Sequence, residues 1–113
     1  MMLQGKRVLV TAAAGGGIGF ATARRCAEEG AFVILADIHE RRLGEAADKI
    51  AEIMGERPPT AICNVTDQDQ VDAMFAIAGD VDILVNNAGL GGTANLVDMT
   101  DDQWSRVLDV SLT

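Results

Sequence analysis

The sequence is poor in cysteine and in clustered basic residues, and each shortage argues against a class of protein. It has two cysteines, Cys26 and Cys63, and neither lies in a CxxC pair or beside a histidine. A disulfide framework and a metal site are therefore not expected, and a reducing cytoplasm is the expected location. Nine basic residues face 17 acidic ones, a net charge of −8, which argues against partners such as nucleic acid or an anionic membrane.

Long apolar runs are also missing from the chain. No stretch of about 18 or more apolar residues is present, so no transmembrane helix is expected. Residues 8–23 are uncharged and follow two basic residues, as in a signal peptide. Their centre is glycine, a poor helix former, so we favour a folded segment over that alternative. A chain of 113 residues predicts one domain at most.

Apolar runs and helical periods alternate along the chain. The runs predict strands buried on both faces at residues 7–11, 32–37, 60–63 and 82–86. The helical periods cover about 17–29, 41–54, a third segment that starts after the cap Thr66, and a fourth with the stripe Trp104, Val107, Leu108 and Ser111. Gly30, Gly55 and Gly79 are the predicted helix ends. Four βα units predict an α/β fold, a Rossmann-like doubly wound parallel sheet.

A glycine-rich loop, TAAAGGGIG at residues 11–19, joins the first strand to the first helix. Glycine lets backbone N–H groups approach a phosphate without an intervening Cβ atom, and the helix start favours an anion. The loop therefore predicts a pyrophosphate site, although a tight βα turn alone would also explain it.

Asp37 closes the second predicted strand, 18 residues after Gly19. A carboxylate there can accept both ribose hydroxyls of an adenosine and repels a 2′-phosphate, so NAD is favoured over NADP. Two alternatives stay open. Asp37 could instead cap the next helix, and His39, Arg41 or Arg42 could receive a 2′-phosphate.

With these features, the chain resembles the amino-terminal half of the classical short-chain dehydrogenase/reductase family. The likeness is carried by the glycine loop, Asp37, Asn64-Val65, the run Asn86-Asn87-Ala88-Gly89 and residues 104–113. The resemblance implies a strand order of 3-2-1-4 and a domain, residues 1–113, that is the NAD(P)-binding part only. It implies cofactor contacts at Gly15, Gly16, Gly17, Ile18, Gly19, Asp37, Ile38, Asn64, Val65, Asn87, Ala88, Gly89 and Val110.

Three departures from the family pattern stand out. Ala12 or Ala13 replaces the first glycine of the loop, Asn64 replaces the commoner aspartate, and Ser111 aligns with the catalytic asparagine. The strand order also leaves the apolar run 82–86 with one bare edge, which predicts a marginal or self-associating chain.

The resemblance implies hydride transfer between a nicotinamide and a carbonyl or alcohol of a small molecule, in a homo-oligomer. Some relatives with a TAAAGxGIG-type loop and a VSLT ending act on steroid-derived or acyl-thioester carbonyls, which the resemblance implies as a substrate class. The family's catalytic Tyr-x-x-x-Lys is not expected here, because the chain has no tyrosine. No catalytic residue is therefore predicted in residues 1–113. The alternatives are a noncatalytic dinucleotide-binding module and, more weakly, a methyltransferase.

Overall fold

The computed structural model describes residues 3–11, 18–64, 67–86 and 108–111 of the chain. The helices are α1 (Ile18–Glu28), α2 (Glu40–Met54) and α3 (Gln68–Ala78). The strands are β1 (Arg7–Thr11), β2 (Phe32–Asp37), β3 (Thr60–Ile62), β4 (Ile83–Asn86) and β5 (Leu108–Ser111). Except for β5, these elements lie within one or two residues of their predicted bounds, which is the usual uncertainty at element ends.

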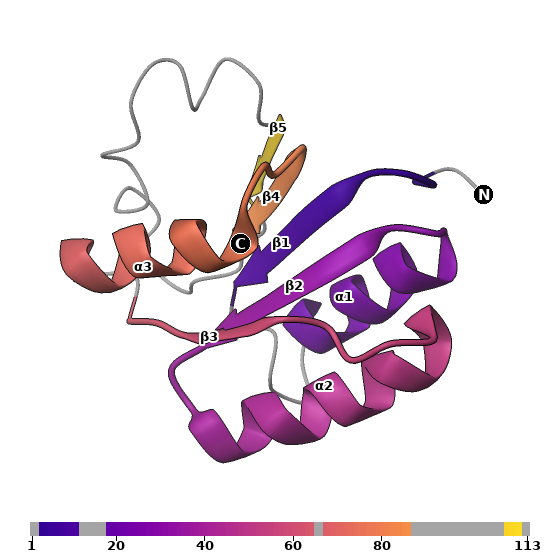
Figure 1. Cartoon of the computed structure of the whole chain (residues 1–113), viewed down its shortest axis with the longest axis horizontal. Helices are drawn as coiled ribbons and strands as arrows, with labels where there is room; N and C mark the ends of the chain where they lie inside the picture. Colours follow the sequence, from indigo (N-terminus) through magenta and orange to yellow (C-terminus); the bar gives the residue numbers. More distant parts are fainter. Residues whose placement is uncertain (1–2, 12–17, 65–66, 87–107, 112–113) are drawn as a thin grey trace.

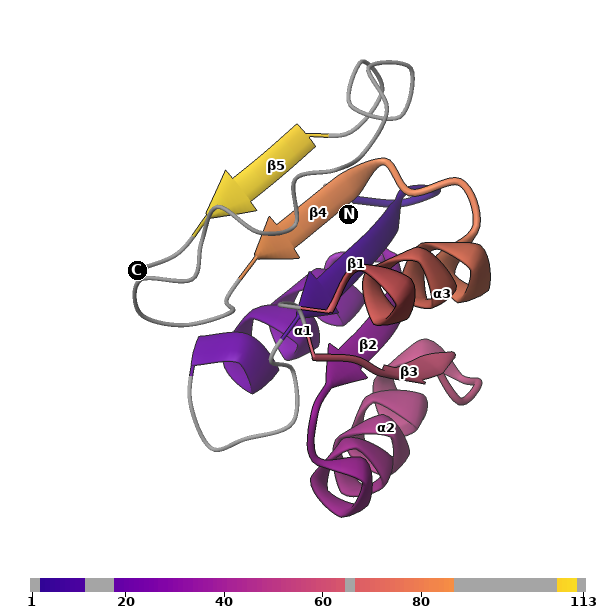
Figure 2. The same cartoon turned by 90° about the vertical axis from the view of Figure 1, so that its left-hand side faces the viewer.

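The strands form one parallel sheet in the order β3-β2-β1-β4-β5. The predicted order 3-2-1-4 is therefore confirmed, and β5 extends the sheet beyond β4. Figure 2 shows β4 and β5 side by side, with their arrowheads pointing the same way. Val8, Leu9 and Val10 of the central strand β1 are fully buried, as a continuous apolar run predicts for a strand covered on both faces.

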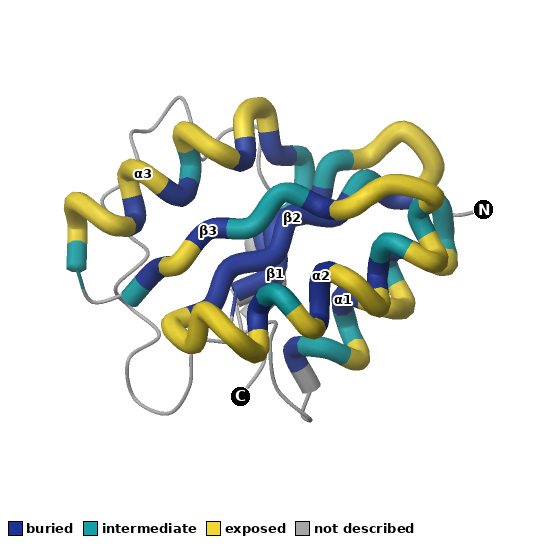
Figure 3. The backbone as a smooth tube through the Cα atoms, turned by 60° about the horizontal axis from the view of Figure 1, so that its bottom comes forward, coloured by how far each residue is buried: buried dark blue, intermediate teal, exposed yellow. Residues whose placement is uncertain are grey.

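Helices cover both faces of the sheet, α1 and α2 on one face and α3 on the other (Figure 1). Successive strand residues point to opposite faces, so Val8 and Val10 pack under α1 and α2 while Leu9 packs under α3. Figure 3 shows that buried and exposed positions alternate along each helix, as expected for helices that pack one side against the sheet. Burying each large apolar side chain contributes about 1.5–3 kcal/mol, so these two clusters supply most of the fold's stability.

Glycines end two of the helices, as predicted. Gly55 follows α2 with a φ of +82°, and its N–H donates to the carbonyl of Ala51. Gly79 follows α3 with a φ of +73°, and its N–H donates to the carbonyl of Phe75. Both backbones are in a region that side chains with a Cβ rarely adopt, which explains the choice of glycine.

The cap of α3 differs from the prediction by one position. The cap is Asp67, whose Oδ1 accepts hydrogen bonds from the N–H groups of Asp69 at 3.0 Å and Gln70 at 3.3 Å. Thr66, the predicted cap, lies outside the described residues. A carboxylate is both a hydrogen-bond acceptor and a negative charge at the positive end of the helix, so it favours the cap position on two grounds.

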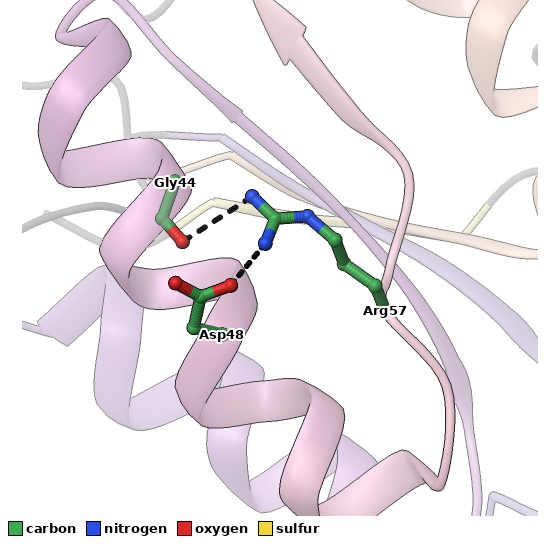
Figure 4. Close-up of polar contacts among 3 residues, drawn as sticks. All are labelled: Gly44, Asp48 and Arg57. Atoms are coloured by element: carbon green, nitrogen blue, oxygen red, sulfur yellow. Dashed lines mark hydrogen bonds and ion pairs between the residues drawn. The ribbon is translucent and has the colours of Figure 1, made fainter.

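The connection between α2 and β3 is tied back to α2 by Arg57. Its guanidinium pairs with the carboxylate of Asp48 and donates to the carbonyl of Gly44 at 3.4 Å (Figure 4). Farther along the connection, the carbonyl of Pro59 accepts the N–H of Leu35 at 3.0 Å. The Arg57 pair is exposed, so its contribution to stability is small.

The expected fourth helix is wrong over residues 108–111. These residues form β5, in which Leu108 lies opposite Ile83 and Val110 opposite Val85. Leu-Asp-Val-Ser also fits the two-residue period of a strand, and so short a segment does not distinguish that period from a helical one. Residues 100–107 of the expected helix lie outside the described residues.

The bare edge expected on β4 is also wrong, because β5 pairs with it. A strand beside an open edge satisfies backbone N–H and C=O groups that would otherwise stay unpaired. The structure therefore gives no support for self-association through an open edge at residues 83–86.

Candidate functional site

The described part of the chain buries two polar or charged side chains, and both stand at the last residue of a strand. Thr11 closes β1 and is 1% exposed, and Asp37 closes β2 and is 8% exposed. Because β1 and β2 are parallel neighbours, with Thr11 opposite Ala36, the two residues lie at the same end of the sheet. Buried polar groups away from water are costly unless they have partners, so this end of the sheet differs chemically from the apolar core.

Thr11 connects β1 to β4 at this end. Its hydroxyl donates to the carbonyl of Val85 at 3.4 Å. The central strand β1 lies between β2 on one side and β4 on the other, which is where the direction of strand order reverses. In open parallel sheets, ligands bind just beyond the strand ends at such a reversal. Thr11 was not among the predicted site residues, although it is the first residue of the glycine-rich loop 11–19.

The glycine loop leads from Thr11 to α1. Gly15, Gly16 and Gly17 lie outside the described residues, and α1 begins at Ile18. The first turn of α1 has no acidic residue, whereas α2 and α3 each have one there. The positive end of the α1 dipole is therefore not compensated by a carboxylate of its own first turn, which suits an anion. Gly19 of that turn is buried.

The carboxylate of Asp37 is fixed by the backbone that follows it. Its Oδ1 accepts the N–H of His39 at 3.0 Å. His39, with an extended backbone and no capping side-chain bond, is the N-cap of α2. The alternative of Asp37 as the cap is therefore wrong, and the contact with His39 instead orients the carboxylate at the strand end.

Ile38 and Asn64 flank Asp37 on adjacent segments. Ile38 is 55% exposed, and Asn64 is half-buried. The N–H of Cys63 donates to the carbonyl of Asp37 at 3.0 Å, which joins the ends of β2 and β3. These three predicted site residues are thus brought together. An exposed isoleucine beside a buried carboxylate offers an apolar surface next to a hydrogen-bond acceptor.

Basic side chains lie at the start of α2, one to two turns beyond Asp37. Arg41 pairs with Glu45 at 3.4 Å, and Arg42 and His39 are exposed. No ion pair of Arg42 is present in the described ranges. The alternative of a basic group for a 2′-phosphate therefore stays open for Arg42.

The other predicted site residues either lie outside the described residues or belong to β5. Val65, Asn87, Ala88 and Gly89 lie outside the described residues. Val110 was expected in a helix, and the structure places it in β5, opposite Val85. Ser111, expected at a catalytic position of that helix, lies opposite Asn86 of β4.

Neither cysteine has the surroundings of a reactive thiol. Cys63 is buried and Cys26 is half-buried, and both are free. Burial raises the pKa of both thiols, and the charge of Asp67 raises the pKa of Cys63 further. The thiolate is the nucleophilic form, so nucleophilic chemistry by these cysteines is disfavoured.

The described residues hold neither a membrane-spanning helix nor a metal-binding cluster. None of the three helices there combines the length and the hydropathy needed to cross a bilayer. The same residues contain no cluster of histidine, cysteine and acidic side chains that could hold a metal ion.

The short chain dehydrogenase family profile matches residues 6–113. Over 116 aligned residues, the chain is 56% identical to a Mycobacterium tuberculosis protein named (5R,7aS)-5-hydroxy-7a-methyl-1-oxo-2,3,5,6,7,7a-hexahydro-1H-indene-carboxyl-CoA reductase, covering 99% of the chain and 44% of that protein. It is 40% identical to the 3-oxoacyl-[acyl-carrier-protein] reductase FabG of Thermotoga maritima, covering 99% of the chain and 46% of the reductase. The chain thus spans about half the length of the curated relatives it matches.

Solved structures of related oxidoreductases also match the chain. A short chain dehydrogenase from Mycobacterium smegmatis superposes with a TM-score of 0.72 at 53% identity, over 93% of this chain and 45% of that one. L-sorbose reductase from Gluconobacter frateurii, complexed with NADPH and L-sorbose, has a TM-score of 0.72 at 35% identity, over 92% and 41%. NAD⁺-bound xylitol dehydrogenase has a TM-score of 0.70 at 37% identity, over 80% and 35%.

Proposed function

The chain belongs to the short-chain dehydrogenase family, and on that premise we propose that it is the dinucleotide-binding part of an NAD(P)-dependent oxidoreductase. The enzyme would transfer a hydride between a nicotinamide and a carbonyl or alcohol carbon. One observation carries the proposal: the two buried polar side chains of the described part, Thr11 and Asp37, stand together where parallel strands end beside the start of α1.

Each part of this strand end has a task in holding a dinucleotide. The start of α1, together with the glycine loop, would hold the pyrophosphate through backbone N–H groups. Asp37 would accept hydrogen bonds from the ribose hydroxyls, each worth roughly 1.5–3 kcal/mol when the acceptor is charged. The exposed Ile38 and the neighbouring Asn64 would border the adenine.

We propose NAD as the preferred cofactor. The carboxylate of Asp37, held in place by the N–H of His39, would repel the 2′-phosphate of NADP. Solved relatives include one complexed with NADPH and one bound to NAD⁺, so the preference of this chain rests on Asp37 itself.

The nicotinamide supplies the hydride chemistry when the cofactor is bound, and the residues of this chain supply binding and orientation. None of the 113 residues is a tyrosine, so residues 1–113 do not provide the tyrosine that the resemblance implies as proton donor. The task of this region is to fix the adenosine end and the pyrophosphate, which sets the position of the nicotinamide.

We propose an acyl-thioester or a steroid-derived ketone as the substrate class. The two curated relatives described above are named as reductases of a bicyclic carboxyl-CoA compound and of a 3-oxoacyl chain on acyl carrier protein. Both names describe an acyl group carried on a thiol. The enzyme would be cytoplasmic and homo-oligomeric, in keeping with its free cysteines and its family. Light scattering of the intact protein tests the oligomer.

Calorimetric titration of the intact protein with NAD and with NADP tests the proposed function. We expect saturable binding of both and tighter binding of NAD. Asp37→Asn keeps an acceptor for His39 but removes the charge, so NAD affinity should fall about 10- to 100-fold and the preference over NADP should shrink.

The matched control is Asp80→Asn, which removes the same charge from an exposed position after α3. It should leave both affinities unchanged. Absence of saturable binding of either nucleotide to the unmodified protein would overturn the proposal.

A further inference from the structure

The start of α3 makes an unusual set of contacts with Asn64. In a common capping arrangement, the side chain of the third helical residue accepts the N–H of the cap residue. Here the cap is Asp67 and the third helical residue is Gln70. The Oε1 of Gln70 reaches past the cap and accepts the N–H of Asn64 at 2.8 Å.

The backbone of Asn64 is therefore held at both of its polar groups. Its N–H donates to Gln70, and its carbonyl accepts the N–H of Asp67 at 2.9 Å. The Nε2 of Gln70 also donates to Oδ2 of Asp67 at 3.2 Å, which fixes the amide orientation. Asp67 and Gln70 are thus bonded to each other and together hold the backbone of Asn64 in place.

Capping of the helix does not require this side chain. Asp67 already accepts the N–H groups of Asp69 and Gln70 through Oδ1. Gln70 is exposed and packs into neither apolar cluster. Its two side-chain bonds add nothing to the helix ladder, and what they fix is the place of Asn64 beyond the end of β3.

Asn64 is one residue from the link between β3 and Asp37. The N–H of Cys63 donates to the carbonyl of Asp37, so a shift at Asn64 is transmitted to the strand end that carries the buried carboxylate. We propose that Gln70 is a positioning residue for the adenosine end of the dinucleotide and acts through the backbone of Asn64. This inference rests on the proposed function, since it assigns the adenosine end to Asp37 and Asn64.

Binding of nucleotide fragments to the intact protein tests the inference. ADP-ribose probes the adenosine end, and nicotinamide mononucleotide probes the other end. Gln70→Ala should weaken ADP-ribose binding about three- to tenfold, the range expected for one lost hydrogen bond. It should leave nicotinamide mononucleotide binding unchanged. Gln68→Ala is the matched control, because Gln68 lies in the same helical turn and bonds to Asp72 instead.

Exchanging the amide and carboxylate side chains of positions 67 and 70 distinguishes a role in positioning Asn64 from a role in helix stability. Gln70→Glu keeps an acceptor for Asn64 but places a second carboxylate against Asp67, so ADP-ribose affinity should fall. Adding Asp67→Asn restores a donor and acceptor pair at unchanged net charge, and affinity should return to within about twofold of the original. Hydrogen exchange at the Asn64 amide should quicken in Gln70→Ala and slow again in the double variant.

The outcomes separate the two proposals. If the unmodified protein binds neither NAD nor ADP-ribose, the proposed function fails. If it binds both and Gln70→Ala behaves like Gln68→Ala, the positioning role is overturned. Equal loss of ADP-ribose and nicotinamide mononucleotide binding in Gln70→Ala also overturns it, because only the adenosine end should respond.

Discussion

The two ends of the sheet use their polar residues in different ways. At the amino-terminal end, Arg7 donates its N–H to the carboxylate of Asp82 at 2.9 Å, its guanidinium donates to the carbonyl of Ala78, and its charge lies 4.6 Å from the ring centre of Phe32. At the carboxyl-terminal end, the carboxylate of Asp37 accepts the N–H of His39 at 3.0 Å, beside the exposed Ile38. The contacts at the first end join strands to helices, and the second end carries the residues that we propose bind the dinucleotide.

The difference follows from the topology of a parallel sheet. The carbonyl end of α3 and the starts of β1, β2 and β4 meet at the amino-terminal end, so a cation there stabilises a helix terminus. The starts of helices meet at the carboxyl-terminal end, where they favour anions. The same rule accounts for Arg7 at one end and for a glycine loop at the other.

Replacing Arg7 should give the largest loss of stability. Arg7→Met keeps the apolar stem but removes the guanidinium contacts, and we expect the free energy of unfolding to fall by about 2–3 kcal/mol. Urea unfolding measures the change. The nucleotide affinity of the folded fraction should stay constant. A large drop in affinity would contradict the view that the Arg7 end of the sheet serves stability and the Asp37 end serves binding.

Replacing Thr11 should affect stability less and binding more. Thr11→Val keeps the shape of a fully buried side chain but removes its hydrogen bond to the carbonyl of Val85, a cost of about 1–2 kcal/mol. The ends of β1 and β4 then lose one side-chain bond beyond their backbone ladder, so NAD affinity should fall with stability. Calorimetry and urea unfolding of the same samples compare the change in affinity with the change in stability. An unchanged affinity would show that Thr11 contributes to stability alone.

A smaller effect is expected from the titration of Cys63. Its pKa is raised above the ordinary value of 9.0, so the folded protein holds this proton more tightly than the unfolded chain does. That contribution to stability is complete below pH 9 and is lost as pH rises through the folded pKa. Urea midpoints should therefore fall as the pH rises above about 9, and Cys63→Ala should make this fall smaller. An identical pH dependence in both proteins would contradict this origin.

The smallest effect is expected from Arg57. Arg57→Ala removes an exposed pair with Asp48 and a bond to Gly44, so stability should fall by about 0.5 kcal/mol or less and the difference should shrink at high salt. A loss above about 1 kcal/mol would show that the contacts of Arg57 with Asp48 and Gly44 stabilise the connection to β3 more than exposed contacts usually do.

Much of the fold could be predicted from the sequence because its signals are local. Continuous apolar runs gave four strands, and Gly55 marked the end of α2. The segment 108–111 was wrongly assigned to a helix, because its partner strand lies more than 20 residues away and four residues carry little periodicity. Asp67 was missed as a cap because Thr66 beside it is also a capping type.

The site was predicted in part for the same reason. Asp37 could be found because a carboxylate at the last position of a buried strand is a local signal. The hydrogen bond of Thr11 depends on Val85, 74 residues farther along the chain, so no local pattern shows it. The bond between Asn64 and Gln70 spans six residues, but the usual capping pattern predicts a bond to the cap residue instead.

The most direct test follows backbone amide chemical shifts of the intact protein during titration with NAD. The account predicts the largest shifts at Gly19, Asp37, Ile38 and Asn64, and none of comparable size at Arg7, Gly79 and Asp82. Saturable shifts centred on the Arg7 end of the sheet, or no saturable shifts at all, would contradict it.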